Sequence, residues 1–111
     1  MSDTFDVMII GGGAAATSAA LTLLNRGKTV GVVTNKPETS SLFKAEKVTN
    51  YPGLPPMTGA ELTALFRRQL EESKAEIIIG RALSVMPMGN SFGVAVPYTR
   101  REMGLSTQGI D

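Results

Sequence analysis

Residues 5–24 read FDVMIIGGGAAATSAALTLL, and this stretch decides the fold. It begins with an apolar run, continues with three glycines and ends in a segment rich in alanine and leucine. A buried strand, a glycine turn and a helix in that order begin a dinucleotide-binding βαβ unit. Gly11 permits the tight turn, Gly13 leaves room for a pyrophosphate beside the backbone, and Ala16 is small enough for close helix packing. The sequence therefore predicts an adenine dinucleotide site, against the simpler alternative of an ordinary glycine-rich turn in an α/β domain.

A helix is expected over residues 14–25, directly after the glycines. Its first turn, which contains Ala14 and Ala15, leaves backbone N–H groups without helical partners and carries a partial positive charge, and both attract a diphosphate. A second strand, rich in β-branched residues, is predicted over residues 29–34. Its last residue, Thr34, stands where such folds contact the adenosine ribose.

The remaining elements follow from local patterns. They are an amphipathic helix over residues 59–73 behind a capping box at residues 58–61, a third buried strand over residues 76–79, and a hairpin formed by residues 83–88 and 91–96. Residues 36–50 show neither helical nor strand period and are expected to form a long connection.

The last 15 residues differ in character from the rest. Residues 97–111 are polar, contain Gly104 and Gly109, and begin with Pro97, which cannot donate a hydrogen bond to a sheet. We expect a partial dinucleotide-binding domain over residues 1–96 and a disordered or non-homologous tail over residues 97–111.

Composition excludes several classes of function. The 111 residues suffice for one domain, and a net charge of +1 with 5% aromatic residues argues against nucleic-acid binding. The pairs Arg67–Arg68 and Arg100–Arg101 are expected on solvated faces. The sequence has no apolar stretch long enough to span a membrane. We expect a cytoplasmic protein that binds neither nucleic acid nor membrane.

The sequence contains no histidine and no cysteine. It therefore lacks the usual acid–base group near neutral pH, and it offers no disulfide, zinc thiolate or dithiol redox centre. We expect no metal site and no catalytic side chain. Any redox chemistry would have to be carried by a bound cofactor.

Four segments, in this order, resemble the FAD-binding domain of the thioredoxin reductase family. DVMIIGGG at residues 6–13 resembles D-V-I-I-I-G-G-G, and VTNYPG at residues 48–53 resembles V-E-N-[WY]-P-G. TGAEL at residues 58–62 resembles [ST]-G-x-E-L, and AEI at residues 75–77 resembles A-E-I. The asparagine–aromatic–proline–glycine segment is the most specific of these. The resemblance extends over about residues 3–96 and implies a Rossmann-like, three-layer α/β FAD/NAD(P)-binding domain with a parallel sheet and a hairpin or meander, truncated at its C-terminus.

The resemblance implies FAD as cofactor. It assigns Gly11, Gly13, Ala14, Ala15 and Thr34 to the adenosine and pyrophosphate, and it places Leu42 and Asn50 near the flavin. For Asn50, an equal alternative is a turn residue that caps its own backbone.

The sequence also departs from the family pattern. Ala14 and Ala16 replace a proline and a glycine, and residues 39–42 read TSSL where the family has G-G-Q-L. By this resemblance, we expect the backbone to approach the flavin less closely and an amide contact to be lost. The ribose position, at Thr34, is neutral rather than acidic.

By the same resemblance, a complete enzyme passes electrons from a reduced donor through FAD to a disulfide. Its partners would be a thioredoxin-like disulfide protein and a second copy in a homodimer. The NADPH domain and its C-x-x-C dithiol are missing from these 111 residues, so we expect an N-terminal FAD-binding portion that is inactive alone. The alternatives are a non-catalytic dinucleotide-binding module and a non-functional gene fragment.

Overall fold

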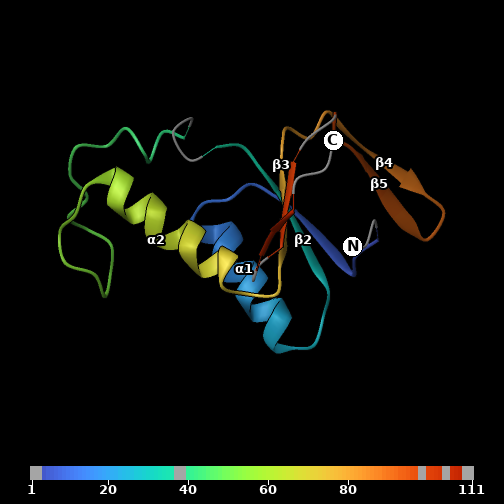
Figure 1. Ribbon diagram of the computed structural model, residues 1–111, viewed down its shortest axis with the longest axis horizontal. Coiled ribbons are helices and arrows are strands. Elements are labelled where there is room, and N and C mark those ends of the chain that lie inside the picture. Colours follow the sequence, from blue (N-terminus) through green and yellow to red (C-terminus); the bar gives the residue numbers. More distant parts are fainter. Residues whose placement is uncertain (1–3, 37–39, 98–99, 104–105, 109–111) are drawn as a thin grey trace.

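The computed structural model describes residues 4–36, 40–97, 100–103 and 106–108. It contains a five-stranded sheet in the order β1-β2-β3-β6-β7 and a separate two-stranded sheet, β4-β5. The elements are β1 Val7–Ile10, α1 Ala14–Asn25, β2 Val30–Thr34, α2 Gly59–Glu71, β3 Glu76–Ile79, β4 Ser84–Met88, β5 Ser91–Ala95, β6 Arg100–Met103 and β7 Ser106–Gln108. Figure 1 shows α2 and the β4-β5 hairpin at opposite ends of the molecule, with the main sheet between them.

Strands β1, β2 and β3 form a parallel sheet. Val7 pairs with Val30 in the first ladder, and Gly31 pairs with Glu76 in the second. The branched side chains of β2 and β3 are buried except at the last residue of each strand, as the inner strands of a parallel sheet require. The predicted α/β class with a parallel sheet is therefore confirmed.

A reciprocal pair of hydrogen bonds ties the start of β1 to the start of β2. Asp6 N–H donates to Thr29 Oγ1, and Thr29 N–H donates to Asp6 Oδ2, each over 2.8 Å. The Thr29 backbone N–H, followed by the Thr29 side chain, lowers the pKa of the Asp6 carboxyl below its ordinary value. These two exposed hydrogen bonds align the start of β1 with the start of β2.

Helix α1 packs against β1, β2 and α2. The shared core consists of small and branched side chains that are fully or almost fully buried: Ala20, Val30, Val32, Leu70, Ala75 and Ile77. On α2, Leu62, Phe66 and Leu70 are buried and Leu65 is half-buried, in agreement with the predicted amphipathic helix. The capping box is also confirmed, because Thr58 Oγ1 accepts from Glu61 N–H while Glu61 Oε1 accepts from Thr58 N–H.

The hairpin forms as predicted, around Gly89 with φ of +67°. Several large apolar side chains on it are exposed to solvent: Val85, Met86, Met88 and Phe92.

The last two strands differ from the predicted irregular tail. β6 pairs antiparallel with β3, so that Ile79 lies opposite Arg100, and β7 pairs with β6. An open edge of β3 presents backbone N–H and C=O groups, which pair with any extended backbone whether or not its side chains alternate. The sequence prediction relied on alternating apolar residues to identify a strand, and it therefore did not detect this backbone pairing. The predicted domain boundary at residue 96 stays a prediction, and residues 98–99, 104–105 and 109–111 of the tail lie outside the described part.

Candidate functional site

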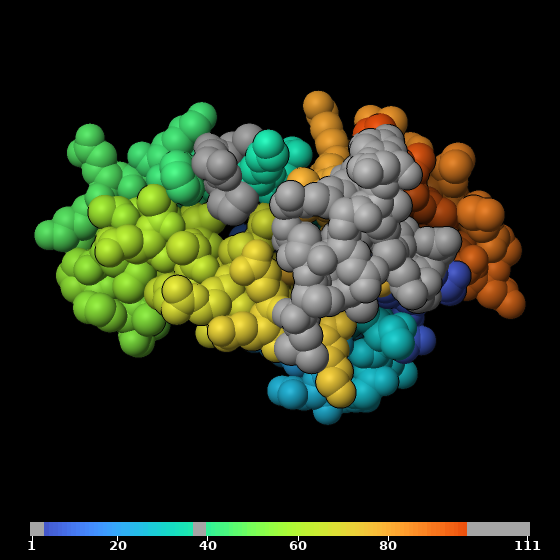
Figure 2. All heavy atoms as spheres, in the orientation of Figure 1, coloured from blue at the N-terminus to red at the C-terminus, as the bar shows by residue number. Residues whose placement is uncertain are grey.

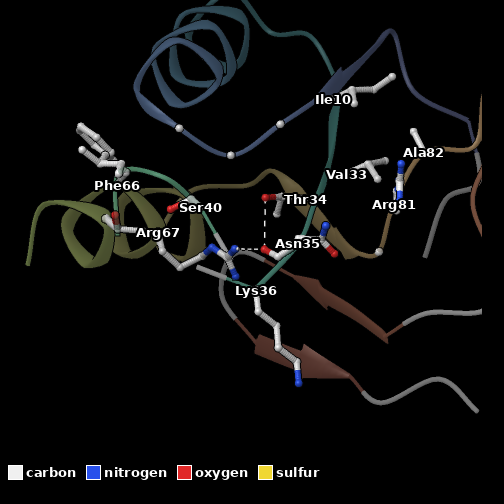
Figure 3. A pocket seen from close by; sticks show the side chains of 16 residues that line it. Ile10, Val33, Thr34, Asn35, Lys36, Ser40, Phe66, Arg67, Arg81 and Ala82 are labelled. Carbon is white, nitrogen blue, oxygen red and sulfur yellow. Dashed lines mark hydrogen bonds between the residues drawn. The ribbon is translucent and has the colours of Figure 1, made fainter. Parts of the chain in front are cut away.

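A cavity of about 340 Å3 lies at the carboxyl ends of β1, β2 and β3 (Figure 3). Open α/β sheets bind ligands at this edge. The turns after β1 and β3, at residues 11–13 and 80–82, contribute to the lining, together with residues 33–36 at the end of β2 and just beyond it. The rest comes from Ile10 at the end of β1, from Ser40 and Leu42 in the long loop, and from Thr63, Phe66 and Arg67 on α2.

The three residues of the glycine turn have different requirements. Gly11 has φ of +123°, a conformation that favours glycine, and its N–H donates to Val33 O over 2.8 Å. A Cβ at Gly12 would overlap the Thr34 side chain. Among the described residues, a Cβ at Gly13 would meet no atom within 4 Å. Packing within the chain therefore explains glycine at position 12 but not at position 13, where the space opens to the cavity.

Helix α1 begins beside this space. Gly13 is its N-cap, no side chain caps it, and its first turn carries no acidic residue. The N–H groups of the first turn have no helical acceptors, so they are available to an anion. Together with the open space at Gly13, they fit the pyrophosphate of a dinucleotide such as FAD.

The long loop reaches the cavity by folding back on the start of α2. Gly59 N–H donates to Ala45 O over 2.8 Å, and a Cβ at Gly59 would overlap the carbonyl of Leu42. Only a glycine at this position lets the two backbones approach so closely. Figure 2 shows residues 40–57 as a surface continuous with α2. This packing brings Leu42 and Ser40 to the cavity wall, where Ser40 Oγ also accepts from Phe43 N–H.

The structure thus brings together four of the seven predicted site residues: Gly11, Gly13, Thr34 and Leu42. Among the described residues, the lining does not include Ala14, Ala15 or Asn50. Ala14 and Ala15 lie next to it, in the first turn of α1. Asn50 is exposed in the loop beside Tyr51, whose ring lies 5.7 Å from that of Phe66. The assignment of all seven to a ligand stays a prediction.

Arg67 is one of the lining residues that the sequence motifs did not predict. It was expected on a solvated face with Arg68, but it is half-buried and lines the cavity, whereas Arg68 is exposed. Its Nη2 donates to Asn35 O over 2.9 Å, just beyond the end of β2 (Figure 3). Helical spacing places Arg67 on the same face as Thr63, four positions earlier, but the sequence alone does not place that face beside the cavity.

The described residues contain no cluster of His, Cys, Asp and Glu side chains that could hold a metal ion. Within the same residues, no helix is long and apolar enough to cross a membrane.

A strand, a glycine turn with open space at Gly13 and a helix N-terminus facing a cavity together define a dinucleotide-binding domain. Residues 6–76 match the family described as "FAD binding domain". The chain belongs to this family, and its cofactor is FAD.

Comparison with known proteins confirms the thioredoxin reductase-like character. The chain is 35% identical over 81 residues to a thioredoxin reductase of Aquifex aeolicus, a match that covers 72% of this chain and 25% of that protein. A ferredoxin-flavin thioredoxin reductase structure from Clostridium acetobutylicum superposes with a TM-score of 0.77 and 31% identity, covering 92% of this chain and 36% of that one. A thioredoxin reductase structure from Gloeobacter violaceus gives a TM-score of 0.77 and 27% identity, with coverage of 90% and 32%. The chain therefore spans between a quarter and about a third of the length of these relatives.

Proposed function

We propose that this chain is the FAD-binding portion of an oxidoreductase in which FAD carries electrons from a reduced donor to a disulfide. The cavity at the glycine turn supports this function most strongly, because the space beside Gly13 is open and no neighbour among the described residues explains a glycine there. Membership of the FAD-binding domain family and likeness to thioredoxin reductases give the site its cofactor class.

The residues around the cavity would share the binding of FAD. The glycine turn and the first-turn N–H groups of Ala14 and Ala15 would hold the pyrophosphate, since helix N-termini favour anions. Thr34, at the end of β2, would contact the adenosine ribose through its hydroxyl. Leu42 and Asn50 would lie toward the flavin. Bound FAD supplies the two-electron chemistry, and the protein supplies position and electrostatics.

The chain's own side chains cannot complete a disulfide reduction. It has no cysteine to form a dithiol and no histidine to move protons near neutral pH. We propose that a thioredoxin-like protein, a homodimer and a cytoplasmic location belong to the complete system. The resemblance to thioredoxin reductases supports the first two.

A second candidate is a nucleotide-binding module without catalysis. The described lining supports it, because the glycine turn and the end of β2 form the part of such a fold that holds the adenosine diphosphate half of a dinucleotide.

Titration of the purified chain with FAD, ADP, NAD and riboflavin separates these functions. The first proposal predicts that FAD and ADP bind, with FAD at least as tight as ADP, and that NAD binds more weakly. The second predicts that ADP and NAD bind and that the flavin adds nothing. Failure of both FAD and ADP to bind would contradict both proposals.

A further inference from the structure

Two side chains from different elements share one carbonyl oxygen at the end of β2. Thr34 Oγ1 donates to Asn35 O over 3.3 Å, and Arg67 Nη2 donates to the same oxygen over 2.9 Å. Figure 3 shows the two hydrogen bonds converging on this carbonyl, below the glycine turn. Because a carbonyl oxygen has two lone pairs, Asn35 O can hold both side chains at once, and it keeps them beside each other at the cavity wall.

This arrangement leaves complementary groups for a ligand. A hydroxyl has one proton, and that of Thr34 is directed to Asn35 O, so its oxygen can only accept a further hydrogen bond. A guanidinium only donates, and the other N–H groups of Arg67 have no acceptor among the described residues. A hydrogen-bond acceptor and a donor therefore stand side by side, both on half-buried residues that line the cavity.

The acceptor is held close to the glycine turn. A Cβ at Gly12 would overlap the Thr34 side chain, so the hydroxyl of Thr34 lies against the turn assigned to the pyrophosphate. The described lining residues include no aspartate or glutamate. Where many dinucleotide-binding folds present a carboxylate to the ribose, this chain presents a neutral acceptor together with a cationic donor.

The chemistry of a ribose hydroxyl fits this pair. An acidic residue in this part of the fold accepts a hydrogen bond from the ribose 2′-hydroxyl. A hydroxyl also accepts hydrogen bonds through its own lone pairs, which a carboxylate cannot use because it has no proton to donate. Thr34 and Arg67 can use both capacities of the same hydroxyl. The adenosine ribose of FAD carries a free 2′-hydroxyl and is therefore a suitable ligand.

We propose that Thr34 and Arg67 together bind the 2′-hydroxyl of the adenosine ribose of FAD. The hydroxyl donates its proton to Thr34 Oγ1, and its oxygen accepts a hydrogen bond from the Arg67 guanidinium. The proposal rests on the proposed function, in which Thr34 alone contacts the ribose. It adds Arg67 as a second ribose-binding residue and makes the 2′-hydroxyl, rather than the 3′-hydroxyl, the group that the site recognises.

Three nucleotides test the proposal on the full chain. ADP, 2′-deoxy-ADP and 3′-deoxy-ADP carry the same diphosphate and base and differ in one ribose hydroxyl. We expect 2′-deoxy-ADP to bind about tenfold more weakly than ADP in isothermal titration calorimetry, because a hydrogen bond to a charged group contributes at least this much. Binding of 3′-deoxy-ADP should stay within about threefold of that of ADP.

Variants identify the side chains responsible, with the ratio of the ADP and 2′-deoxy-ADP affinities as the readout. A loss of charge or a local rearrangement weakens both nucleotides and cancels in this ratio. Arg67→Met, which removes the donors and keeps an apolar stem, should reduce the tenfold preference to about threefold or less. Thr34→Val should reduce it similarly, whereas Thr34→Ser, which keeps the hydroxyl, should retain it. Arg68→Met is the matched control, since Arg68 is exposed on the same helix, and it should leave the ratio unchanged.

Three results would overturn the proposal. They are equal binding of ADP and 2′-deoxy-ADP, an equal loss for the two deoxy compounds, and an Arg67→Met variant that weakens ADP and 2′-deoxy-ADP by the same factor. The last result would mean that Arg67 acts through its charge or through the fold. If ADP and FAD bind but any of these holds, only this inference fails. If neither ADP nor FAD binds, the proposed function fails with it.

Discussion

Gly13→Ala separates the binding role of the glycine turn from its structural role. The new Cβ meets no atom of the described part of the chain within 4 Å, and φ of Gly13 is −85°, which alanine adopts freely. The expected loss of stability is therefore that of a poorer N-cap, about 0.5–1 kcal/mol. In a thermal melt this corresponds to a shift of about 2–6 °C.

The same methyl group should strongly weaken the binding of ADP or FAD. It fills the space assigned to the pyrophosphate, and overpacking by one methyl group costs about 1–3 kcal/mol. This predicts a weakening of about 5- to 150-fold in isothermal titration calorimetry.

Gly12→Ala is the matched control. Its Cβ would overlap the Thr34 side chain, so the variant should lose about 1–3 kcal/mol of stability. A Gly13→Ala variant that binds ADP as tightly as the unmodified chain would refute the assignment of that space to a ligand.

Further predictions concern the fold and the limits of the chemistry. Thr58→Ala removes the capping-box hydroxyl and should lower the free energy of unfolding by about 1 kcal/mol in urea denaturation, whereas an unchanged midpoint would show that the cap is dispensable. Leu70→Ala empties a fully buried position and should cost about 2–5 kcal/mol, while a loss below 1 kcal/mol would mean that the helix packs loosely. Because the pKa of Asp6 is lowered from its ordinary value of 3.8, its contribution to stability is present above that pH and is lost as the pH falls through the folded value. Asp6→Asn should therefore be less stable at neutral pH and show a flatter acid unfolding curve, and parallel curves would contradict this. With FAD and NADPH added, the chain should release no thiol from a model disulfide above a flavin-only control, since it contains no cysteine.

The parts of the fold that the sequence predicts are those with local causes. The glycine turn, the capping box at Thr58 and the β-branched strands each depend on residues near one another in the chain, and each lies where it was expected. Strands β6 and β7 depend instead on a free backbone edge of β3, which no side-chain pattern reports.

The residues of the site also fall into two groups, those with local causes and those that tertiary packing brings in. Gly11, Gly13 and Thr34 were found from the motif because the βαβ unit itself places them together. Arg67 joins them through the packing of α2 against the end of β2, a contact between residues 32 positions apart in the sequence. A single sequence carries no direct signal for such a contact, and a pair of arginines on a helix is more often solvated.

The central claim is that the cavity at the carboxyl ends of β1, β2 and β3 binds the adenosine diphosphate part of a dinucleotide. Amide NMR shifts of the 15N-labelled chain, followed as ADP is added, test this most directly. The account predicts saturable shifts concentrated in residues 11–16, 34–36 and 80–82, with little change in the hairpin at residues 84–95. Absence of saturable shifts at the glycine turn, or shifts centred on the hairpin, would contradict it.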